Sequence, residues 1–273
     1  LDVFVNEPGE GAEVHSPLFE HDSVVVTPHL GASTREAQDK AGVTIAQQVV
    51  LALAGDFVPF AVNIAAAEAS ETVRPFLPLA EQLGRVFGSL SGSLPDQVEI
   101  EYQGGLAAED TRILTLAALK GLFSVAGLDE PVSYVNAPQV AAARGLSYRE
   151  SRSAASPDFV NLVTLRGGPH AVSGTLAGAR SKPRLVMLDG HPVEVPPAPN
   201  MLVVRNDDRA GMIGLVGTVL ADAGVNIADM AVGRSPEGGT ALMVLATDQP
   251  VPQEVIARLT SEPGILAADP VYA

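Results

Sequence analysis

His29 is the side chain whose type and position best suit proton transfer. It follows the apolar run 24–26 and a Thr-Pro dipeptide, at the end of a predicted buried strand. Imidazole has an unperturbed pKa of about 6.5 and exchanges protons near neutral pH. A carboxylate bonded to its other ring nitrogen fixes the tautomer, and we assign this role to Glu7. The pair predicts removal of a substrate hydroxyl proton as hydride leaves carbon. The alternative is that a lone histidine after proline merely ends the strand.

Three motifs surround this pair in one order within the first 34 residues. They are Leu1-Asp-Val-Phe-Val-Asn-Glu7-Pro8, Ser16-Pro-Leu-Phe19 and Thr27-Pro-His-Leu-Gly-Ala-Ser-Thr34. Together they closely resemble the D-isomer-specific 2-hydroxyacid dehydrogenases, and among these the long-form phosphoglycerate dehydrogenases.

The resemblance implies a role for four residues. His29 and Glu7 match the catalytic pair of the family, Asp2 would lie near the nicotinamide carboxamide of NAD, and Gly31 would let the backbone approach the cofactor. The implied reaction is NAD-dependent oxidation of 3-phospho-D-glycerate to 3-phosphohydroxypyruvate in L-serine biosynthesis. A related 2-hydroxyacid dehydrogenase with another substrate is the alternative for this block.

A dinucleotide site needs a strand, a glycine-rich turn and a helix N-terminus to hold the pyrophosphate. Gly211, Gly214 and Gly217 are spaced three apart, unlike the G-x-G-x-x-G fingerprint, so we expect them to serve helix packing. The fingerprint, the choice between NAD and NADP and the substrate-binding arginine of the family are expected upstream of Leu1. We therefore expect an N-terminally truncated chain that is inactive alone. A non-catalytic amino-acid-binding regulatory subunit is the alternative if the native chain begins at Leu1.

The last block contains a second set of motifs. These are Val204-Arg-Asn-Asp-Asp-Arg-Ala-Gly-Met-Ile-Gly214 and Ala223-Gly-Val-Asn-Ile227, which resemble an ACT domain, a small ligand-sensing unit. Asp208 follows a strand and Gly211 opens a helix, where backbone N–H groups can receive a carboxylate. Ala210 stands where a proline is common in the family, and alanine restricts the backbone of this loop less than proline does.

The ACT resemblance implies feedback by L-serine. The implied ligand residues are Asn206, Asp208, Gly211 and Asn226. Alternatively, Asp208 is an N-cap and Asn226 a turn residue. ACT sheets commonly pair edge to edge, so we expect a homo-oligomer, a tetramer by the family resemblance, with the ligand site at a subunit interface.

Composition excludes several classes of function. The 273 residues carry a net charge of −15 and no cysteine, which excludes disulfides and thiolate chemistry. The negative charge argues against nucleic-acid and membrane partners. No apolar run approaches about 20 residues and no secretory signal is seen, so a cytoplasmic protein is expected. The other histidines, His15, His21, His170 and His191, are expected on the surface, and no metal site is expected.

Hydrophobic periodicity divides the chain into three blocks, 1–64, 65–198 and 199–273. The first is expected to be the tail of a Rossmann-type catalytic unit, with a strand at 23–27 and a helix at 33–53 capped by Ser33 or Thr34. In the last block, strands are predicted at 201–206, 226–234, 240–247 and 265–272 and helices at 212–223 and 252–260, which is the βαββαβ order of ferredoxin-like folds. The fold class is therefore α/β and α+β multidomain.

The middle block resembles the intervening, allosteric substrate-binding domain of long-form phosphoglycerate dehydrogenases. It alternates predicted helices at 73–90, 111–126 and 138–148 with predicted strands at 97–102, 159–166, 170–177 and 184–195. Asp189-Gly190 is predicted to form a hairpin turn. Arg184, with Arg180 and Lys182, could bind a phosphate at a second substrate site, and a solvated basic loop is the favoured alternative.

Overall fold

The computed structural model describes residues 1–4, 16–58, 60–62, 69–128, 131–235 and 237–273. Its contacts form two units, Leu1–Val58 and Pro59–Ala273, and each is described by itself. Among the described helices, none combines the length and the apolar character that a membrane span needs.

The first unit contains a short 3-10 helix, η1 (Pro17–Glu20), and one long helix, α1 (Arg35–Ala54). Thr34 caps α1, because its Oγ1 accepts a hydrogen bond from the Ala37 amide at 3.1 Å. Gly55, with a φ of 74°, ends the helix in the left-handed conformation that glycine adopts readily. The predicted helix is confirmed, and none of its side chains is buried.

The strand predicted at 23–27 is wrong. Within the described residues this segment bonds to Leu1, whose ammonium group donates to the Val25 carbonyl at 2.7 Å and whose carbonyl accepts from the Thr27 amide at 2.9 Å. A β-strand requires a longer series of backbone hydrogen bonds to a neighbouring strand. Residues 23–27 form no such series with the described residues. The apolar run therefore adopts irregular structure.

The second unit contains a six-stranded sheet in the order β2-β1-β3-β4-β5-β6. Its strands are β1 (Gln97–Gly104), β2 (Ser147–Ser153), β3 (Asn161–Gly167), β4 (His170–Ala177), β5 (Lys182–Leu188) and β6 (His191–Val195). β1 and β2 run parallel, and the other neighbours run antiparallel. The predicted turn at Asp189-Gly190 is confirmed, with φ angles of 46° and 78°.

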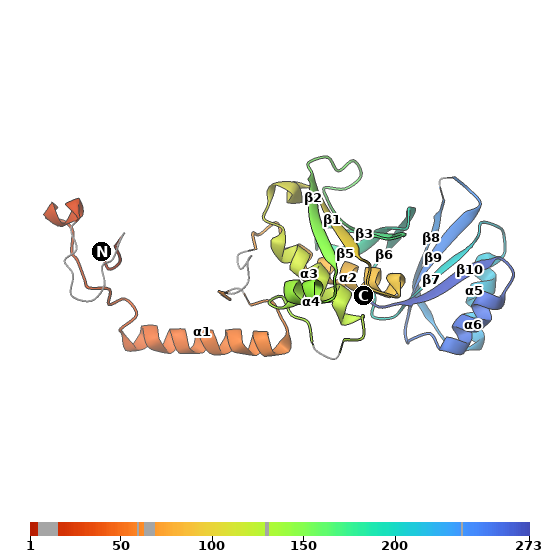
Figure 1. Cartoon of the computed structure of the whole chain (residues 1–273), viewed down its shortest axis with the longest axis horizontal. Coiled ribbons are helices and arrows are strands. Elements are labelled where there is room, and N and C mark those ends of the chain that lie inside the picture. Colours follow the sequence, from red (N-terminus) through yellow and green to blue (C-terminus); the bar gives the residue numbers. More distant parts are fainter. Residues whose placement is uncertain (5–15, 59, 63–68, 129–130, 236) are drawn as a thin grey trace. The chain divides into compact units, whose positions relative to one another are not determined.

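Helices cover one face of this sheet (Figure 1). They are α2 (Leu77–Ser91), α3 (Arg112–Ser124) and α4 (Ala137–Ala143), with short 3-10 helices η2 (Arg74–Phe76) and η3 (Gly105–Ala108). α2 packs on β3, β4 and β5, and α3 packs on α2 and α4. Gly84 and Gly121 lie where α2 and α3 cross, since a Cβ at Gly84 would lie 2.8 Å from the Leu122 amide nitrogen and one at Gly121 2.8 Å from the Glu81 carbonyl carbon. Only glycine permits this approach.

The helix predicted at 138–148 is wrong at its C-terminal end. The helix stops at Ala143, Gly145 takes a left-handed φ of 71°, and the chain continues as β2 from Ser147. β2 escaped prediction because its sequence, Ser-Tyr-Arg-Glu-Ser-Arg-Ser, has no buried apolar alternation.

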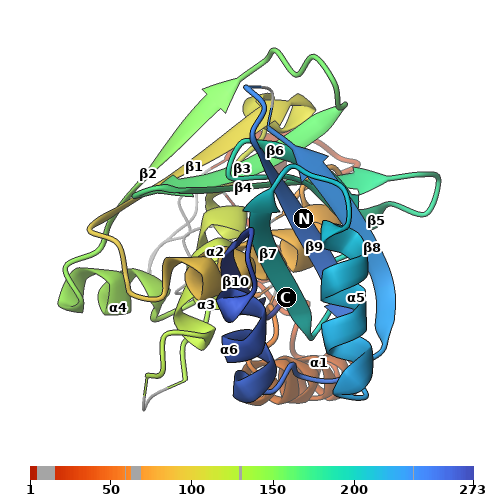
Figure 2. The same ribbon diagram turned by 90° about the vertical axis from the view of Figure 1, so that its right-hand side faces the viewer.

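The second sheet has four antiparallel strands in the order β10-β7-β9-β8. The elements are β7 (Met201–Asp207), α5 (Met212–Asp222), β8 (Ile227–Arg234), β9 (Thr240–Thr247), α6 (Gln253–Ser261) and β10 (Ile265–Val271). This is the predicted βαββαβ order with a ferredoxin-like strand arrangement. Figure 2 shows α5 and α6 side by side over one face of the sheet.

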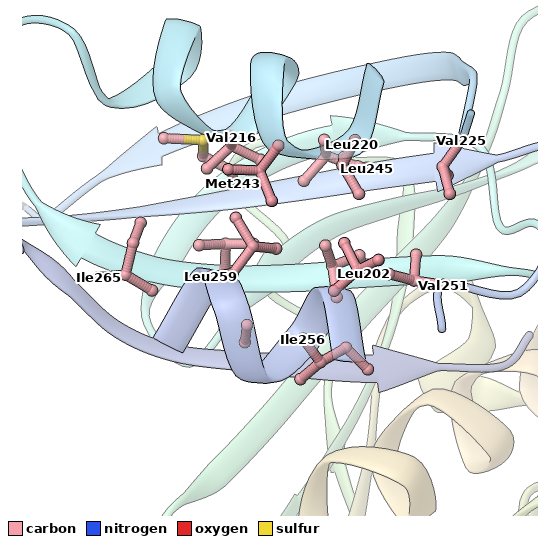
Figure 3. Close-up of a cluster of buried hydrophobic side chains, with 14 of the residues drawn as sticks. Leu202, Val216, Leu220, Val225, Met243, Leu245, Val251, Ile256, Leu259 and Ile265 are labelled. Carbon is pink, nitrogen blue, oxygen red and sulfur yellow. The ribbon is translucent and has the colours of Figure 1, made fainter. Parts of the chain in front are cut away.

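The core of this block lies between the two helices and the sheet (Figure 3). Val216 and Leu220 of α5 and Leu259 of α6 pack against Leu202 of β7 and Leu245 of β9. The other face of the sheet meets the six-stranded block, because β6 contacts β8 and β9, and α2 contacts β10. The two sheets thus belong to one compact unit, while the predicted boundaries at 64/65 and 198/199 stay predictions.

Candidate functional site

Asp2 organises the loop that contains His29. Its Oδ1 accepts hydrogen bonds from Thr27 Oγ1 at 2.6 Å and from the Leu30 amide at 2.7 Å, and its Oδ2 accepts one from the Gly31 amide at 2.7 Å. The bond from Thr27, followed by that from Leu30, holds the pKa of Asp2 below its usual value. The carboxylate is therefore charged at neutral pH. Thr27 was missed from the sequence because only the folded loop reveals its hydrogen bond.

Gly31 is suited to this contact. A Cβ at this position would lie 2.8 Å from Asp2 Oδ2, so a larger residue would displace the carboxylate. The predicted residues His29 and Gly31 therefore lie in one loop, and Asp2 contacts that loop through Thr27, Leu30 and Gly31. Glu7, the predicted partner of His29, lies outside the described residues.

His29 adopts a backbone conformation that is unusual for its type. Its φ is 55°, and its amide donates to the Thr27 carbonyl at 3.0 Å. A left-handed conformation costs a non-glycine residue roughly 1–2 kcal/mol, and such strain often accompanies a functional position. The geometry is consistent with the predicted proton-transfer role, which stays a prediction.

Asn206, Asp208 and Gly211 lie together where β7 passes into α5. Asn206 is buried, its Nδ2 donates to the Asp207 carbonyl at 2.6 Å, and its Oδ1 has no hydrogen-bond partner in the described structure. Gly211, with a φ of 96°, precedes α5, and the N–H groups of the first helical turn have no intrahelical acceptor. An orphaned buried oxygen beside a helix N-terminus suits a small polar ligand.

Asp208 is paired with Arg234 at the end of β8. Arg234 Nε donates to Asp208 Oδ2 at 2.7 Å, and the Nη2 of the same guanidinium lies 2.6 Å from this oxygen in an ion pair. The bond to Asp208 raises the pKa of Arg234. A ligand ammonium at Asp208 would share this carboxylate with the guanidinium. Arg234 therefore borders the predicted site, and the sequence motifs did not indicate it.

Asn226 lies apart from the other three predicted ligand residues within one copy of the chain. It precedes β8, and its Nδ2 donates to Asp248 Oδ2 at 2.8 Å. Arg234, and with it Asp208, lies at the opposite end of this eight-residue strand. One copy of the chain therefore does not bring the four predicted ligand residues together.

Arg180, Lys182 and Arg184 lie around the turn between β4 and β5. Arg180 and Lys182 are exposed, whereas Arg184 is partly buried and its Nη1 donates to the Pro183 carbonyl at 3.1 Å. Phosphate binding at Arg184 stays a prediction. It would fail if Arg184→Ala left every effect of phosphate on the protein unchanged.

His170 and His191 correct the expectation of surface histidines. His191 is 8% exposed, and its Nδ1 lies 3.0 Å from the Asp189 carbonyl oxygen. His170 Nδ1 lies 2.9 Å from Asp189 Oδ2. Both are drawn inward because the β5–β6 turn folds over β4, which sequence spacing did not reveal. No group of three or more residues suited to a metal ion occurs among the residues described.

Comparison with known proteins matches both sheets to families. Residues 72–189 match the D-3-phosphoglycerate dehydrogenase intervening domain, and residues 200–264 match the ACT domain. A D-3-phosphoglycerate dehydrogenase of Mycobacterium tuberculosis is 43% identical over 260 residues, covering 93% of this chain and 48% of the relative. Proteins of the same name from Synechocystis and Bacillus subtilis are 39% and 31% identical, covering 97% and 98% of this chain and 48% and 51% of the relatives.

The chain spans about half the length of the curated relatives it matches. The similarity to the Synechocystis protein covers 97% of this chain, so it includes most of the first unit as well as both sheets of the second. The chain belongs to the D-3-phosphoglycerate dehydrogenase family and carries its intervening and ACT domains.

Proposed function

We propose that this chain serves in the NAD-dependent oxidation of 3-phospho-D-glycerate to 3-phosphohydroxypyruvate, a step of L-serine biosynthesis, and that L-serine binds its ACT domain as a feedback effector. The observation that carries the proposal is similarity over 93–98% of the chain to proteins named D-3-phosphoglycerate dehydrogenase. The ordered loop around His29 and the orphaned oxygen of Asn206 support its two parts.

His29 is proposed to take the hydroxyl proton of the substrate, with Glu7 holding the ring in the reactive orientation. The loop geometry supports this role, because three hydrogen bonds to Asp2 fix residues 27–31 around the histidine. A fixed loop reduces the reorganisation that proton transfer would otherwise require.

Among the described residues, Asp2 and Gly31 are suited to bind the nicotinamide end of NAD. In the described structure, Asp2 Oδ2 accepts a hydrogen bond from the Gly31 amide, and a carboxylate oxygen can accept a second, such as one from the nicotinamide carboxamide. Bound NAD would supply the hydride acceptor. The described part of the first unit holds no strand and glycine-rich turn for the pyrophosphate, so Asp2 and Gly31 are proposed for the nicotinamide end alone.

The catalytic part is tested on the native gene product by following NADH formation from 3-phospho-D-glycerate. We expect His29→Gln to lower kcat about 10²–10⁴-fold, the usual contribution of a general base. His21→Gln is the matched control and should leave kcat unchanged. Equal loss in both variants, or none in His29→Gln, would contradict the assignment.

The ACT part rests on the end of β7. The proposed pose places the L-serine carboxylate at the N-terminus of α5, where Gly211 lets the ligand approach, and the ammonium group at Asp208. The buried Oδ1 of Asn206 would accept a hydrogen bond from the ligand. That bond would remove the cost of leaving this oxygen unsatisfied.

Asn226 is proposed to enter the site from a second copy. In the described structure β8 is an edge strand that pairs with β9, and Met230 and Val232 leave it partly exposed and apolar. Antiparallel pairing of β8 with β8 of another copy would bring the start of one strand beside the end of the other. Asn226 of one copy would then lie near Asp208 of its partner, which supports the proposed homo-oligomer.

Calorimetric titration with L-serine tests this part, with glycine and D-serine as comparison ligands. We expect saturable binding of L-serine that Asn206→Ala and Asn226→Ala abolish and that Gln253→Ala, an exposed amide on α6, retains. Absence of binding, or equal binding of D-serine, would reject L-serine as the effector.

A further inference from the structure

Asp189 joins the two sheets of the second unit. Its Oδ2 accepts hydrogen bonds from His170 Nδ1 at 2.9 Å and from Arg205 Nη2 at 2.8 Å. His170 begins β4 in the six-stranded sheet, whereas Arg205 lies on β7 in the ACT sheet. We call these three residues the Asp189 link.

The carboxylate of the link is held rigidly. Asp189 occupies the β5–β6 turn with a φ of 46°, which directs its backbone and side chain toward β4. Its amide donates to the Ala171 carbonyl at 2.8 Å, and its Oδ1 accepts from the Ala171 amide at 2.9 Å. The side chain is 8% exposed, so loss of Arg205 would leave a poorly compensated charge at the junction.

A glycine permits a second contact nearby. β6 packs against β8, and a Cβ at Gly233 would lie 2.5 Å from the Pro192 carbonyl oxygen and 3.0 Å from the His191 Cβ. The ACT sheet therefore contacts the intervening domain at two places: β7 forms an ion pair with Asp189, and the backbone of β8 at Gly233 packs closely against β6. We call this arrangement the seating of the ACT sheet.

The strand register connects these contacts to the proposed ligand site. Arg205 and Gly233 both lie opposite Leu242 of β9, in one row across the sheet. The next row consists of Asn206, Ala241 and Arg234. Because successive residues of a strand face opposite sides, the first row faces the intervening domain and the second faces the helices.

Each contact residue is therefore the chain neighbour of a ligand-site residue. Arg205 precedes Asn206, and Gly233 precedes Arg234, the partner of Asp208. A shift of β7 or β8 relative to the intervening domain must therefore also move the ligand-site residues on the opposite face of the ACT sheet. We propose that Arg205 and Asp189 are positioning residues for the amino-acid site of the ACT domain, coupling its occupancy to the seating of the ACT sheet on the intervening domain. The inference rests on the proposed L-serine function.

The test combines L-serine titration with hydrogen exchange on the whole chain. Arg205→Gln removes the charge from β7, and Asp189→Asn removes it from the turn while keeping a residue that tolerates positive φ. We expect each to weaken L-serine binding about 5-fold or more, a usual size for coupling between sites. The double variant with both substitutions should lose no more L-serine affinity than either single variant, because both remove the same ion pair. Arg205→Lys should recover part of the affinity.

The matched control is Arg258→Gln. Arg258 donates to Asp222 at 2.8 Å, joining α6 to α5 within the ACT block away from the intervening domain. This variant should bind L-serine as the parent does. A loss equal to that of Arg205→Gln would overturn the proposal, because the effect would then follow any lost ion pair.

Hydrogen exchange separates failure of this inference from failure of the L-serine assignment. Without ligand, Arg205→Gln should accelerate amide exchange at 205–208 and at 191–195, leaving 98–102 in β1 unchanged. If the parent binds no L-serine, the proposed effector fails, and the link is judged by this exchange alone. Exchange equal to that of the parent at both segments would overturn the link.

Discussion

Gly121→Ala is expected to destabilise the α2–α3 pair, although alanine favours helix. A Cβ at Gly121 would lie 2.8 Å from the Glu81 carbonyl carbon and 3.1 Å from the Arg85 amide nitrogen. Carbon atoms make ordinary contact at about 3.5–4.0 Å, so the two helices would have to move apart. Backbone atoms cannot relieve the clash by rotating, as a side chain could.

The size of the effect follows from two opposing contributions. Alanine gains about 1 kcal/mol over glycine within a helix. Overpacking costs about 1–3 kcal/mol, and contact with backbone favours the upper end of that range. The net loss in free energy of unfolding is therefore about 2 kcal/mol, which lowers the urea midpoint by about 1 M for a small-domain slope of about 2 kcal/mol/M.

Urea denaturation followed by far-UV circular dichroism measures this change. Gly217→Ala in α5 is the matched control, since a Cβ there would meet nothing within 4 Å. The control should gain the helical propensity and unfold at an equal or higher urea concentration. If Gly121→Ala were as stable as Gly217→Ala, the helices could not cross as closely as described.

Three further predictions concern the loop of Asp2, helix α1 and the ACT core. The pKa of Asp2 should lie below 3.8, because Thr27 and then Leu30 bond to its charged form. The stabilisation that the charged Asp2 carboxylate gives to the loop should be complete above about pH 4 and should be lost as the pH falls through the lowered pKa. Carbon NMR of the carboxyl group checks this, and Thr27→Val should raise the pKa. Thr34→Ala should cost α1 about 1 kcal/mol by removing its N-cap, while Thr34→Ser retains it; unchanged helical NMR shifts at 35–38 in Thr34→Ala would contradict this. Leu202→Ala should cost about 2–5 kcal/mol, because Leu202 is fully buried between the sheet and the helices; a urea midpoint equal to that of the parent would refute it.

Local signals predicted the ACT fold well. Leu202 and Val204 alternate toward the helices, and the motif around Gly211 marks the start of α5, so chain order and periodicity agreed with the fold. β2 was missed because its polar residues carry no burial pattern. The strand at 23–27 was overpredicted because an apolar run does not reveal whether a neighbouring strand exists.

The candidate sites were predictable only in part. Asn206, Asp208 and Gly211 are close in sequence, so their motif already placed them at one strand end. Contacts such as Asp208–Arg234 and Asp189–Arg205 depend on strand register and on the meeting of two sheets. No local spacing encodes such contacts.

The polar character of β2 bears on self-association. β2 forms an outer edge of the six-stranded sheet and pairs with β1 in the described structure. Its alternating charges, Arg149, Glu150 and Arg152, discourage a foreign strand from adding to the exposed backbone groups. At the other edge, β6 packs against the ACT sheet. The strand that prediction overlooked is therefore suited to keeping concentrated protein from growing into extended β-aggregates.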